Sequence, residues 1–319
     1  MPPPSDDAAL ARWLDPEMRA FVTESERDEP DGPGSGDLGV TRARYERLCA
    51  GFAVPRPEGV TVADEAAGGV AARRYRPARP AHDAVLLYAH GGGFVLGGLE
   101  SHDSICADLC AASGIEVVAV AYRLAPEHRY PAALDDVAAA YGALAAARPV
   151  LVAGDSAGGN LAAALCHRLR RLGGAQPRGQ VLIYPMLSAD PLRVAGSRNA
   201  TAPLLTADDC AGFLRLYGGR PQPAGDPEFA PLAAASFAGL APAAIFAAGF
   251  DPLRQDAEDY AAALHAAGVA VRWRDDPGLV HGWLRGRHRA RLARAAFAAI
   301  AEAVAALADP RMAAIMSRL

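Results

Sequence analysis

The chain has 319 residues, of which 51% are hydrophobic and 21% are charged, and its formal net charge at pH 7 is -4. This length is typical of one large α/β domain, and the weak charge argues against a nucleic-acid-binding surface. No apolar run reaches the roughly 18–20 residues that span a bilayer, and the sequence MPPPSDDAAL at the amino terminus lacks a secretory signal pattern. We therefore expect a cytoplasmic protein without a membrane span.

Five cysteines are present, an odd number with no CxxC pair. Cys106 and Cys110 are four residues apart on a predicted helix, which is a spacing that two metal ligands can have. No second pair of ligands accompanies them. Buried, reduced thiols are the better interpretation, and neither a metal nor a cofactor is expected.

Residues 1–50 are expected to lie outside the main sheet. The helical stretches LARWLDPEMRAFVTE and TRARYERLCAGF flank a loop rich in proline, glycine and aspartate, DEPDGPGSGD. No strand pattern alternates with these helices, so the segment is predicted to be an appendage.

From residue 60 the chain alternates short apolar runs with helical stretches. The runs predicted as strands are VAARRYRP, AVLLYAH, IEVVAVAY, VLVAGD, QVLIYP, AAIFAAG and VAVRWRD. Helices are predicted between them, and a long final helix is predicted from about residue 286 to residue 308. Apolar strands that alternate with helices indicate an α/β fold with a mostly parallel sheet, flanked by helices on both faces.

Two predicted helices have recognisable ends. The helix SHDSICADLCAASG is predicted to begin with Ser101 as its N-cap and to end before Gly114. A stretch of about 55 residues interrupts the alternation after QVLIYP and contains the helix TADDCAGFLRLYGG. Thr206 and Asp209 form a capping-box pattern at its start.

The pentapeptide GDSAG, residues 154–158, matches the pattern G-x-S-x-G between a predicted strand and a predicted helix. Such a sharp turn strains the backbone of Ser156, and the glycines on either side leave room where side chains would collide. The turn would expose the serine hydroxyl as a nucleophile. A plain serine N-cap is the simpler alternative on this pentapeptide alone.

The sequence HGGGF, residues 90–94, follows another predicted strand. Consecutive glycines leave backbone N–H groups uncovered, so an anionic oxygen can approach them. A phosphate-binding loop is the rival interpretation, but neither a following Lys-Ser/Thr nor a G-x-G-x-x-G spacing is present. We predict an oxyanion hole with donors from Gly92, Gly93 and Ala157.

A base and an acid are expected on loops after later strands, at the same edge of the sheet as Ser156. Asp251 follows the strand AAIFAAG, whereas Asp256 and Asp259 lie inside the next helix and are expected to point away. A helix N-cap is the alternative role for Asp251. Of the eight histidines, only His281 is on a loop at the correct edge after the acid.

These features together give the chain a marked resemblance to one family. HGGGFVLGG, YRLAPEHRYPAALDD, GDSAGGNLAAAL, DPLRQDAEDYAAAL and HGW resemble the hormone-sensitive lipase family of α/β-hydrolases in content and order. The resemblance covers roughly residues 60–305. The order Ser156, Asp251, His281 is the one that α/β-hydrolases use for a catalytic triad.

The resemblance implies a helical cap over an α/β-hydrolase core. Residues 1–50 and 190–222 would form the cap, and 51–189 and 223–319 the core. Apolar residues of the two cap segments are expected to roof the serine: Trp13, Phe21, Leu204, Leu205, Phe213 and Leu216.

Individual residues are also expected to shape the site. Trp283 stands where the family usually has phenylalanine, which should affect the shape of the pocket. Residues expected near the substrate are Phe94, Asp155, Leu205, Phe213 and Trp283. Asp155 should orient neighbouring loops, and His90 should brace the glycine loop. Arg123 and Glu127 are expected to pair.

The expected function is hydrolysis of carboxylic esters with short- to medium-chain acyl groups, through an acyl-serine intermediate. Amidases, acyltransferases and deacetylases of a specific small molecule or natural product would use the same triad. A receptor that binds without turnover, as in plant gibberellin receptors that resemble the same family, is a further alternative. The presence of His281 argues against it. The expected partner is a small ester substrate, and a homodimer would be in line with the family.

Overall fold

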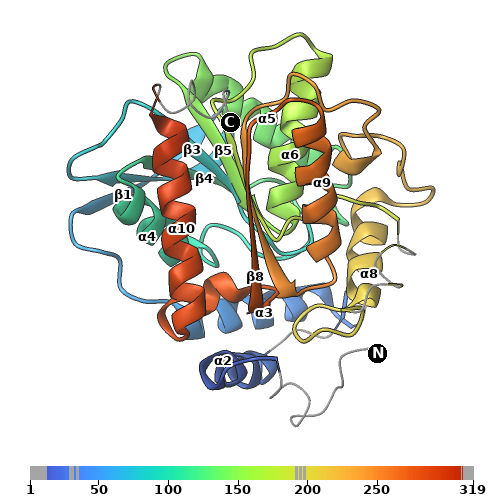
Figure 1. The fold of residues 1–319 in the computed structure, drawn as a ribbon. Helices are drawn as coiled ribbons and strands as arrows, with labels where there is room; N and C mark the ends of the chain where they lie inside the picture. Colours follow the sequence, from blue (N-terminus) through green and yellow to red (C-terminus); the bar gives the residue numbers. More distant parts are fainter. Residues whose placement is uncertain are drawn as a thin grey trace.

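The computed structural model of the chain describes residues 13–28, 32–33, 36–190, 193, 196, 199–309 and 311. Its centre is an eight-stranded sheet with the order β1-β2-β4-β3-β5-β6-β7-β8 (Figure 1). The strands are β1 Val60–Ala67, β2 Val70–Pro77, β3 Val85–Ala89, β4 Glu116–Val120, β5 Val150–Asp155, β6 Gln180–Ile183, β7 Ala243–Phe250 and β8 Val271–Val280. The β1–β2 and β2–β4 pairs are antiparallel, and the pairs from β4 through β3 to β8 are parallel.

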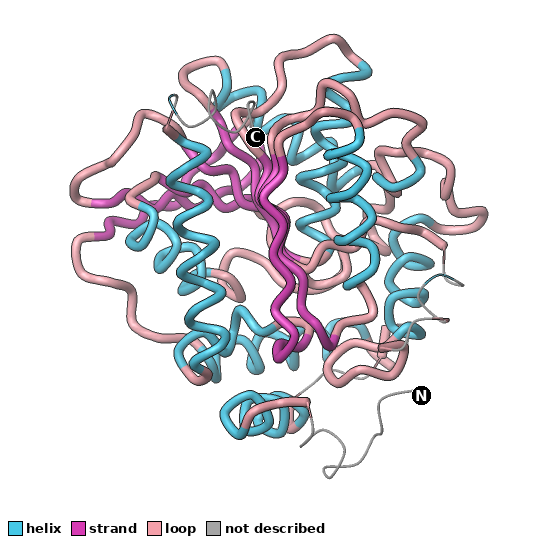
Figure 2. Tube along the Cα trace, viewed as in Figure 1, coloured by secondary structure: helices cyan, strands magenta, loops and turns pink. Residues whose placement is uncertain are grey.

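Helices cover both faces of the sheet, and three more lie at its lower edge. The helices are α2 Pro16–Glu26, α3 Leu38–Phe52, α4 Asp103–Ser113, α5 Ala132–Ala145, α6 Ala157–Arg171, α8 Ala207–Gly218, α9 Arg254–Ala266 and α10 Arg291–Ala308. Figure 1 shows α4 and α10 on one face and α5, α6 and α9 on the other. The helices α2, α3 and α8 lie toward the lower edge, and Figure 2 shows the strands enclosed between the two helical layers. The predicted α/β-hydrolase arrangement is therefore confirmed.

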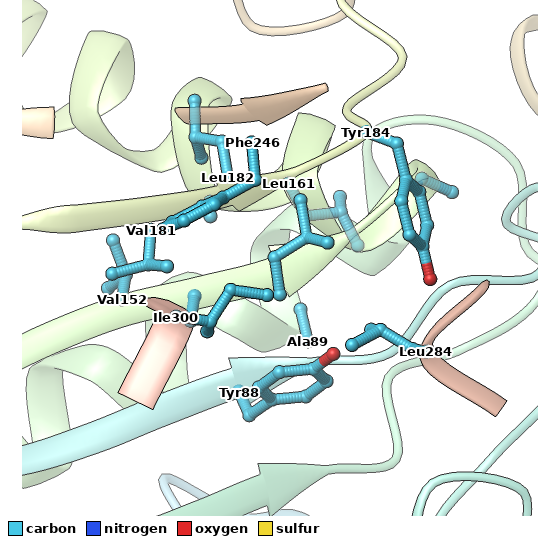
Figure 3. Packing of buried hydrophobic residues seen from close by; sticks show 14 of the residues in the cluster. Tyr88, Ala89, Val152, Leu161, Val181, Leu182, Tyr184, Phe246, Leu284 and Ile300 are labelled. Atoms are coloured by element: carbon cyan, nitrogen blue, oxygen red, sulfur yellow. The ribbon is translucent and has the colours of Figure 1, made fainter. Parts of the chain in front are cut away.

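The core lies between the sheet and its two helical layers. The central strands β3, β5, β6 and β7 are buried along their whole length. Figure 3 shows buried side chains of this core, among them Val152 of β5, Val181 of β6 and Phe246 of β7, with Leu161 from the α6 layer and Ile300 from the α10 layer. Strands buried on both faces form a rigid platform for the loops at their carboxyl ends.

The sequence-based prediction of the elements is confirmed for most of the core and is wrong at three places. The strand β1 was not predicted, because most of its residues are exposed or only partly buried and it lacks an apolar run. The strand β8 extends to Val280, five residues beyond the predicted end. The final helix begins at Arg291, because residues Trp283–His288 form a 3₁₀ helix instead.

One of the predicted helix caps is also wrong. Ser101 is not the N-cap of α4, because its hydroxyl bonds to the backbone of Gly98. Gly114 does end this helix, in the left-handed conformation. The capping box of Thr206 and Asp209 on α8 is confirmed.

Arg123 and Glu127 do not pair with each other. Arg123 binds Asp136 of α5 at 2.8 Å, and Glu127 accepts two hydrogen bonds from Arg42 of α3. The loop that carries both residues is therefore held from two directions, by the core and by the amino-terminal helices.

All five cysteine side chains are buried, as predicted. In the described part of the chain, no helix combines the length and the apolar character that a transmembrane helix requires.

Candidate active site

The carboxyl end of β5 leads directly into a strained turn at Ser156. The backbone of Ser156 has φ 55° and ψ -117°, a conformation that L-residues rarely adopt. A Cβ atom at Gly154 or Gly158 would collide with the carbonyl oxygen of Ala89 on β3. Only glycine lets strand and helix approach this closely, so the two flanking glycines are what make the turn possible.

The structure brings Ser156, His281 and Asp251 into one hydrogen-bonded chain. The Oγ of Ser156 lies 3.0 Å from Nε2 of His281, and Nδ1 of His281 lies 2.7 Å from Oδ2 of Asp251. Ser156 makes no side-chain capping bond to its helix, which argues against a plain N-cap. Because Asp251 is fully buried, its carboxylate has a fixed position beneath the imidazole.

The position of Asp251 is set by the chain around it. It follows β7 immediately, and its Oδ1 accepts a hydrogen bond from the backbone N–H of Leu253 at 2.8 Å. The side-chain amide of Asn199 donates to the carbonyl oxygens of Gly249 and Asp251, at 2.7 and 3.1 Å. One carboxylate oxygen therefore holds the turn, and the other faces His281.

The glycine loop after β3 presents uncovered N–H groups beside Ser156. Gly92 and Gly93 have φ of 116° and 61°, values that favour glycine. A Cβ atom at Gly93 would meet the ring of Phe213 on α8. The N–H groups of Gly92, Gly93 and Ala157 donate no hydrogen bond to any residue that the structure describes. These groups can therefore receive an oxyanion.

The carboxylate of Asp155 ties the glycine loop to β5. It accepts hydrogen bonds from the Tyr88 hydroxyl at 2.8 Å and the Gly91 N–H at 3.0 Å, and it lies 3.2 Å from Nε2 of His102. Burial alone would raise the pKa of Asp155, but the charge of His102 and these hydrogen bonds lower that pKa to about 2. Asp155 stays ionised and holds the loop, as predicted.

His90 supports the same loop from the other side. Its Nδ1 lies 2.8 Å from the carbonyl oxygen of Gly91, and its ring stacks on Tyr122 with centroids 4.2 Å apart. Burial lowers the pKa of His90 to about 4, so the imidazole is neutral at pH 7. His90 therefore braces the loop as a neutral group.

A pocket of about 310 Å³ opens above Ser156. Both predicted cap segments contribute to its wall, with Leu38 and Tyr45 of α3 on one side. On the other side lie Leu204, Leu205, Phe213 and Leu216, from α8 and the loop before it. The pocket is mainly apolar with a polar floor, as is common for small-molecule sites.

Four of the residues predicted to line or roof the pocket lie elsewhere. Phe94 is fully buried and stacks on Tyr217, with ring centroids 3.8 Å apart. Trp283 is buried behind the site, with its ring at 6.1 Å from that of Tyr184. Phe21 is buried against Phe52, whereas Trp13 is 59% exposed. In each case tertiary packing decides the direction of the side chain, which the sequence pattern does not contain.

Tyr184 is a site residue that the sequence analysis missed. It follows β6 directly, has φ 35°, and its ring lies 4.7 Å from that of His281. Its position at the carboxyl end of a central strand is the signal that could have identified it.

The arrangement suits acyl transfer chemistry. With its Nδ1 proton directed at Asp251, the imidazole of His281 can accept the hydroxyl proton of Ser156 through Nε2. The uncovered N–H groups lie where negative charge would develop on a carbonyl oxygen. Among the described residues, no group of three or more His, Cys, Asp or Glu side chains could hold a metal ion.

Comparisons with known proteins point the same way. A family model for the alpha/beta hydrolase fold matches residues 86–285. The carboxylic ester hydrolase LipN of Mycobacterium tuberculosis is 39% identical over 294 residues, which cover 85% of this chain and 77% of that protein. The ethyl acetate hydrolase of Pseudomonas putida is 40% identical over 229 residues, or 67% of this chain and 71% of that protein. The crystal structure of an esterase from the bacterial hormone-sensitive lipase family is 27% identical, with a TM-score of 0.83, over 92% of this chain and 99% of that chain.

Proposed function

Because this chain belongs to the α/β-hydrolase family and is a carboxylic ester hydrolase, we propose that it cleaves short- to medium-chain acyl esters through an acyl-serine intermediate on Ser156. The observation that carries this proposal is the hydrogen-bonded chain from Ser156 through His281 to Asp251. It lies at the floor of an apolar pocket. Ser156 and His281 both line that pocket, so an ester held there would meet the nucleophile directly.

In the first half of the reaction, Ser156 attacks the ester carbonyl while His281 takes the hydroxyl proton. The buried carboxylate of Asp251 keeps the imidazole in the required tautomer and stabilises the imidazolium. The N–H groups of Gly92 and Gly93, with that of Ala157, bind the developing oxyanion. His281 then gives its proton to the departing alkoxide, and the alcohol leaves.

In the second half, a water molecule replaces the alcohol. His281 takes a proton from this water, whose oxygen attacks the acyl-serine carbonyl. The same three N–H groups bind the second oxyanion. Collapse of this intermediate returns the proton to the Oγ of Ser156 and releases the carboxylic acid.

The pocket supports a limit on acyl-chain length. A volume of about 310 Å³ accommodates a short or medium acyl chain, and Leu204, Leu205 and Phe213 close it with apolar surface. Each buried CH₂ contributes about 0.8 kcal/mol to transition-state binding until the pocket is full. The name of the Pseudomonas putida relative, an ethyl acetate hydrolase, supports the same size class.

The experiment that tests this proposal is a series of p-nitrophenyl esters from acetate to palmitate. The expected kcat/KM rises by about three- to fourfold per CH₂, as 0.8 kcal/mol implies, and then falls beyond a medium chain. Highest activity on emulsified long-chain esters would contradict the short-chain proposal. Binding of esters without release of p-nitrophenol would favour a receptor.

The cellular location and the oligomeric state of the protein stay predictions. The five buried cysteines support a reducing compartment, so we place the enzyme in the cytoplasm. A homodimer is tested by sedimentation equilibrium at micromolar concentration, where a mass near 66 kDa, twice the 33.1 kDa chain, would support it. A mass near one chain would contradict it.

A further inference from the structure

A second hollow, of about 470 Å³, lies beside the active-site pocket. Its wall carries three arginines, Arg129, Arg215 and Arg220, and we call it the arginine hollow. Pro33 and Leu216 line both the arginine hollow and the active-site pocket. The two spaces are therefore neighbours, separated by the width of these side chains.

The helix α8 forms the wall between the two spaces. Its Phe213 lines the active-site pocket, Gly212 and Arg215 line the arginine hollow, and Leu216 borders both. Pro33 packs closely on Gly212, where a Cβ atom would collide with its ring. A substrate group that extended past Leu216 would approach the arginines at this wall.

Within the part of the chain that the structure describes, the three arginines of the hollow have no acidic partner. No described residue forms an ion pair or hydrogen bond with the guanidinium groups of the three arginines. Glu127, two residues before Arg129, is already bound to Arg42. Arg123, in the same loop, is paired with Asp136. The acid nearest to Arg129 in sequence is thus engaged elsewhere, although the chain as a whole carries a net charge of -4.

Three like charges around one hollow repel each other, although exposure to solvent weakens the repulsion. Guanidinium groups match carboxylate and phosphate geometry, because parallel N–H groups can donate to two oxygens at once. An oxyanion in the arginine hollow would relieve the repulsion and use these donors. A neutral alcohol or alkyl group would do neither.

Resting on the ester hydrolase function, we propose that the arginine hollow binds a carboxylate carried by the ester substrate. The ester group sits at Ser156 in the active-site pocket, and the carboxylate end passes Leu216 and Pro33. The preferred substrates are then anionic esters, with the charged group several bonds away from the scissile carbonyl.

The test uses matched pairs of substrates that differ only in charge. One series consists of p-nitrophenyl hemiesters of dicarboxylic acids from adipate to sebacate. Each is compared with its neutral twin, in which the free carboxylate is replaced by a methyl ester. The other consists of 4-acetoxyphenyl-alkanoates, each compared with its methyl ester. The Ser156→Ala protein supplies the background rate. In at least one series, kcat/KM of the anionic ester exceeds that of its neutral twin, and 0.5 M NaCl reduces the excess.

The variants Arg129→Gln, Arg215→Gln and Arg220→Gln each lower this anionic preference by about two- to fivefold, the range for a charged contact at an exposed side chain. They leave kcat/KM for the neutral twins within about twofold of the parent value. The control Arg79→Gln removes an exposed arginine outside the hollow and leaves the preference unchanged.

Two results would overturn the proposal. One is a preference for the neutral twin at every length in both series, and the other is an anionic preference that survives all three substitutions. The guanidinium groups would then simply be solvated. Failure of the ester hydrolase function looks different, because the unaltered protein would not hydrolyse the neutral twins either.

Discussion

At the scale of single residues, backbone strain is concentrated around the reacting atoms. Four described residues have positive φ without being glycine. Ser156, Tyr184 and Phe94 lie at carboxyl ends of central strands or in the loop after β3, and Leu204 lines the pocket from the loop before α8. Each such residue costs about 1–3 kcal/mol. The strain persists because buried neighbours hold it, as where the Ile183 carbonyl accepts the Ser156 N–H at 2.9 Å.

The two buried aspartates Asp251 and Asp256 are expected to differ in role, the first acting in catalysis and the second in stability. Asp251→Asn is expected to lower kcat by about 10⁴, because an amide favours the wrong tautomer of His281. Asp256→Asn should leave kcat within about threefold, because Asp256 makes no contact with His281. Measurement of kcat with a short-chain p-nitrophenyl ester for both variants checks this, and the opposite ranking would contradict the placement of the acid.

The structure changes what is expected of Asp256 itself. The sequence suggested a side chain inside the next helix that points away from the site. Asp256 is instead 1% exposed and accepts hydrogen bonds from the N–H groups of Leu187 and Ser188, at 3.0 and 2.8 Å, and from Arg193. Asp256→Asn should therefore lower the unfolding free energy by about 1–3 kcal/mol, measured by urea titration.

These residues also mark how far the sequence could predict the site. Ser156, Asp251 and His281 were found because each follows a predicted strand, and parallel strands end at one edge of the sheet. Phe94 and Trp283 were misplaced because strand order does not determine which way a side chain points. That direction depends on neighbours such as Tyr217, which is distant in sequence.

At the scale of elements, α6 carries the candidate nucleophile at one end and a buried histidine further along. His167 lies against Phe237 and Tyr260, and the Tyr260 hydroxyl is 3.3 Å from its Nε2. Burial, aided by the charge of Arg170, lowers the pKa of His167 from 6.5 to about 3. Between about pH 3 and pH 6.5, the imidazole is therefore neutral in the folded protein but protonated in the unfolded chain.

Stability should consequently fall with acid in a defined window. Because the pKa values of His167 and His90 are depressed, their contribution is complete above pH 6.5 and is lost as pH falls toward 4. Each buried histidine adds a slope of about 1.4 kcal/mol per pH unit. Asp155, whose pKa is lowered to about 2, keeps its full contribution above pH 3.8 and loses it only as pH falls from 3.8 toward 2.

The measurement is the free energy of unfolding from urea titrations between pH 7 and pH 4.5. His167→Gln should roughly halve the slope, whereas the exposed control His265→Gln should leave it unchanged. A flat profile in the unaltered protein would contradict the buried neutral state of both histidines.

At the scale of the whole molecule, the site lies between a rigid sheet edge and a helical roof. The sequence indicated the roof through its resemblance to a family with a helical cap and through apolar residues that had no predicted place in the sheet. It identified Leu205 and Phe213 correctly as pocket residues but not Trp13, because the packing of α2, α3 and α8 on the core is a long-range property. The core, by contrast, could be predicted from alternation and apolar strands alone.

The depth of the pocket predicts opposite effects of two substitutions at one roof position. Leu205→Ala should move the optimum of the p-nitrophenyl ester series to longer acyl chains, and Leu205→Trp should move it to shorter ones. Trp13→Ala, a change at an exposed residue outside the pocket, should leave the series unchanged. If both Leu205 variants kept the parental optimum, the roof would not limit chain length.

The central claim is that Ser156 is the nucleophile, activated by His281. The most direct measurement is reaction with a fluorophosphonate, followed by intact mass and peptide mapping by mass spectrometry. We predict one phosphonyl group per chain, on Ser156. The Ser156→Ala protein should show none, and its kcat for ester hydrolysis should be lower by about 10⁴–10⁶. Phosphonylation at another residue, or a Ser156→Ala protein within tenfold of the parent activity, would contradict the account.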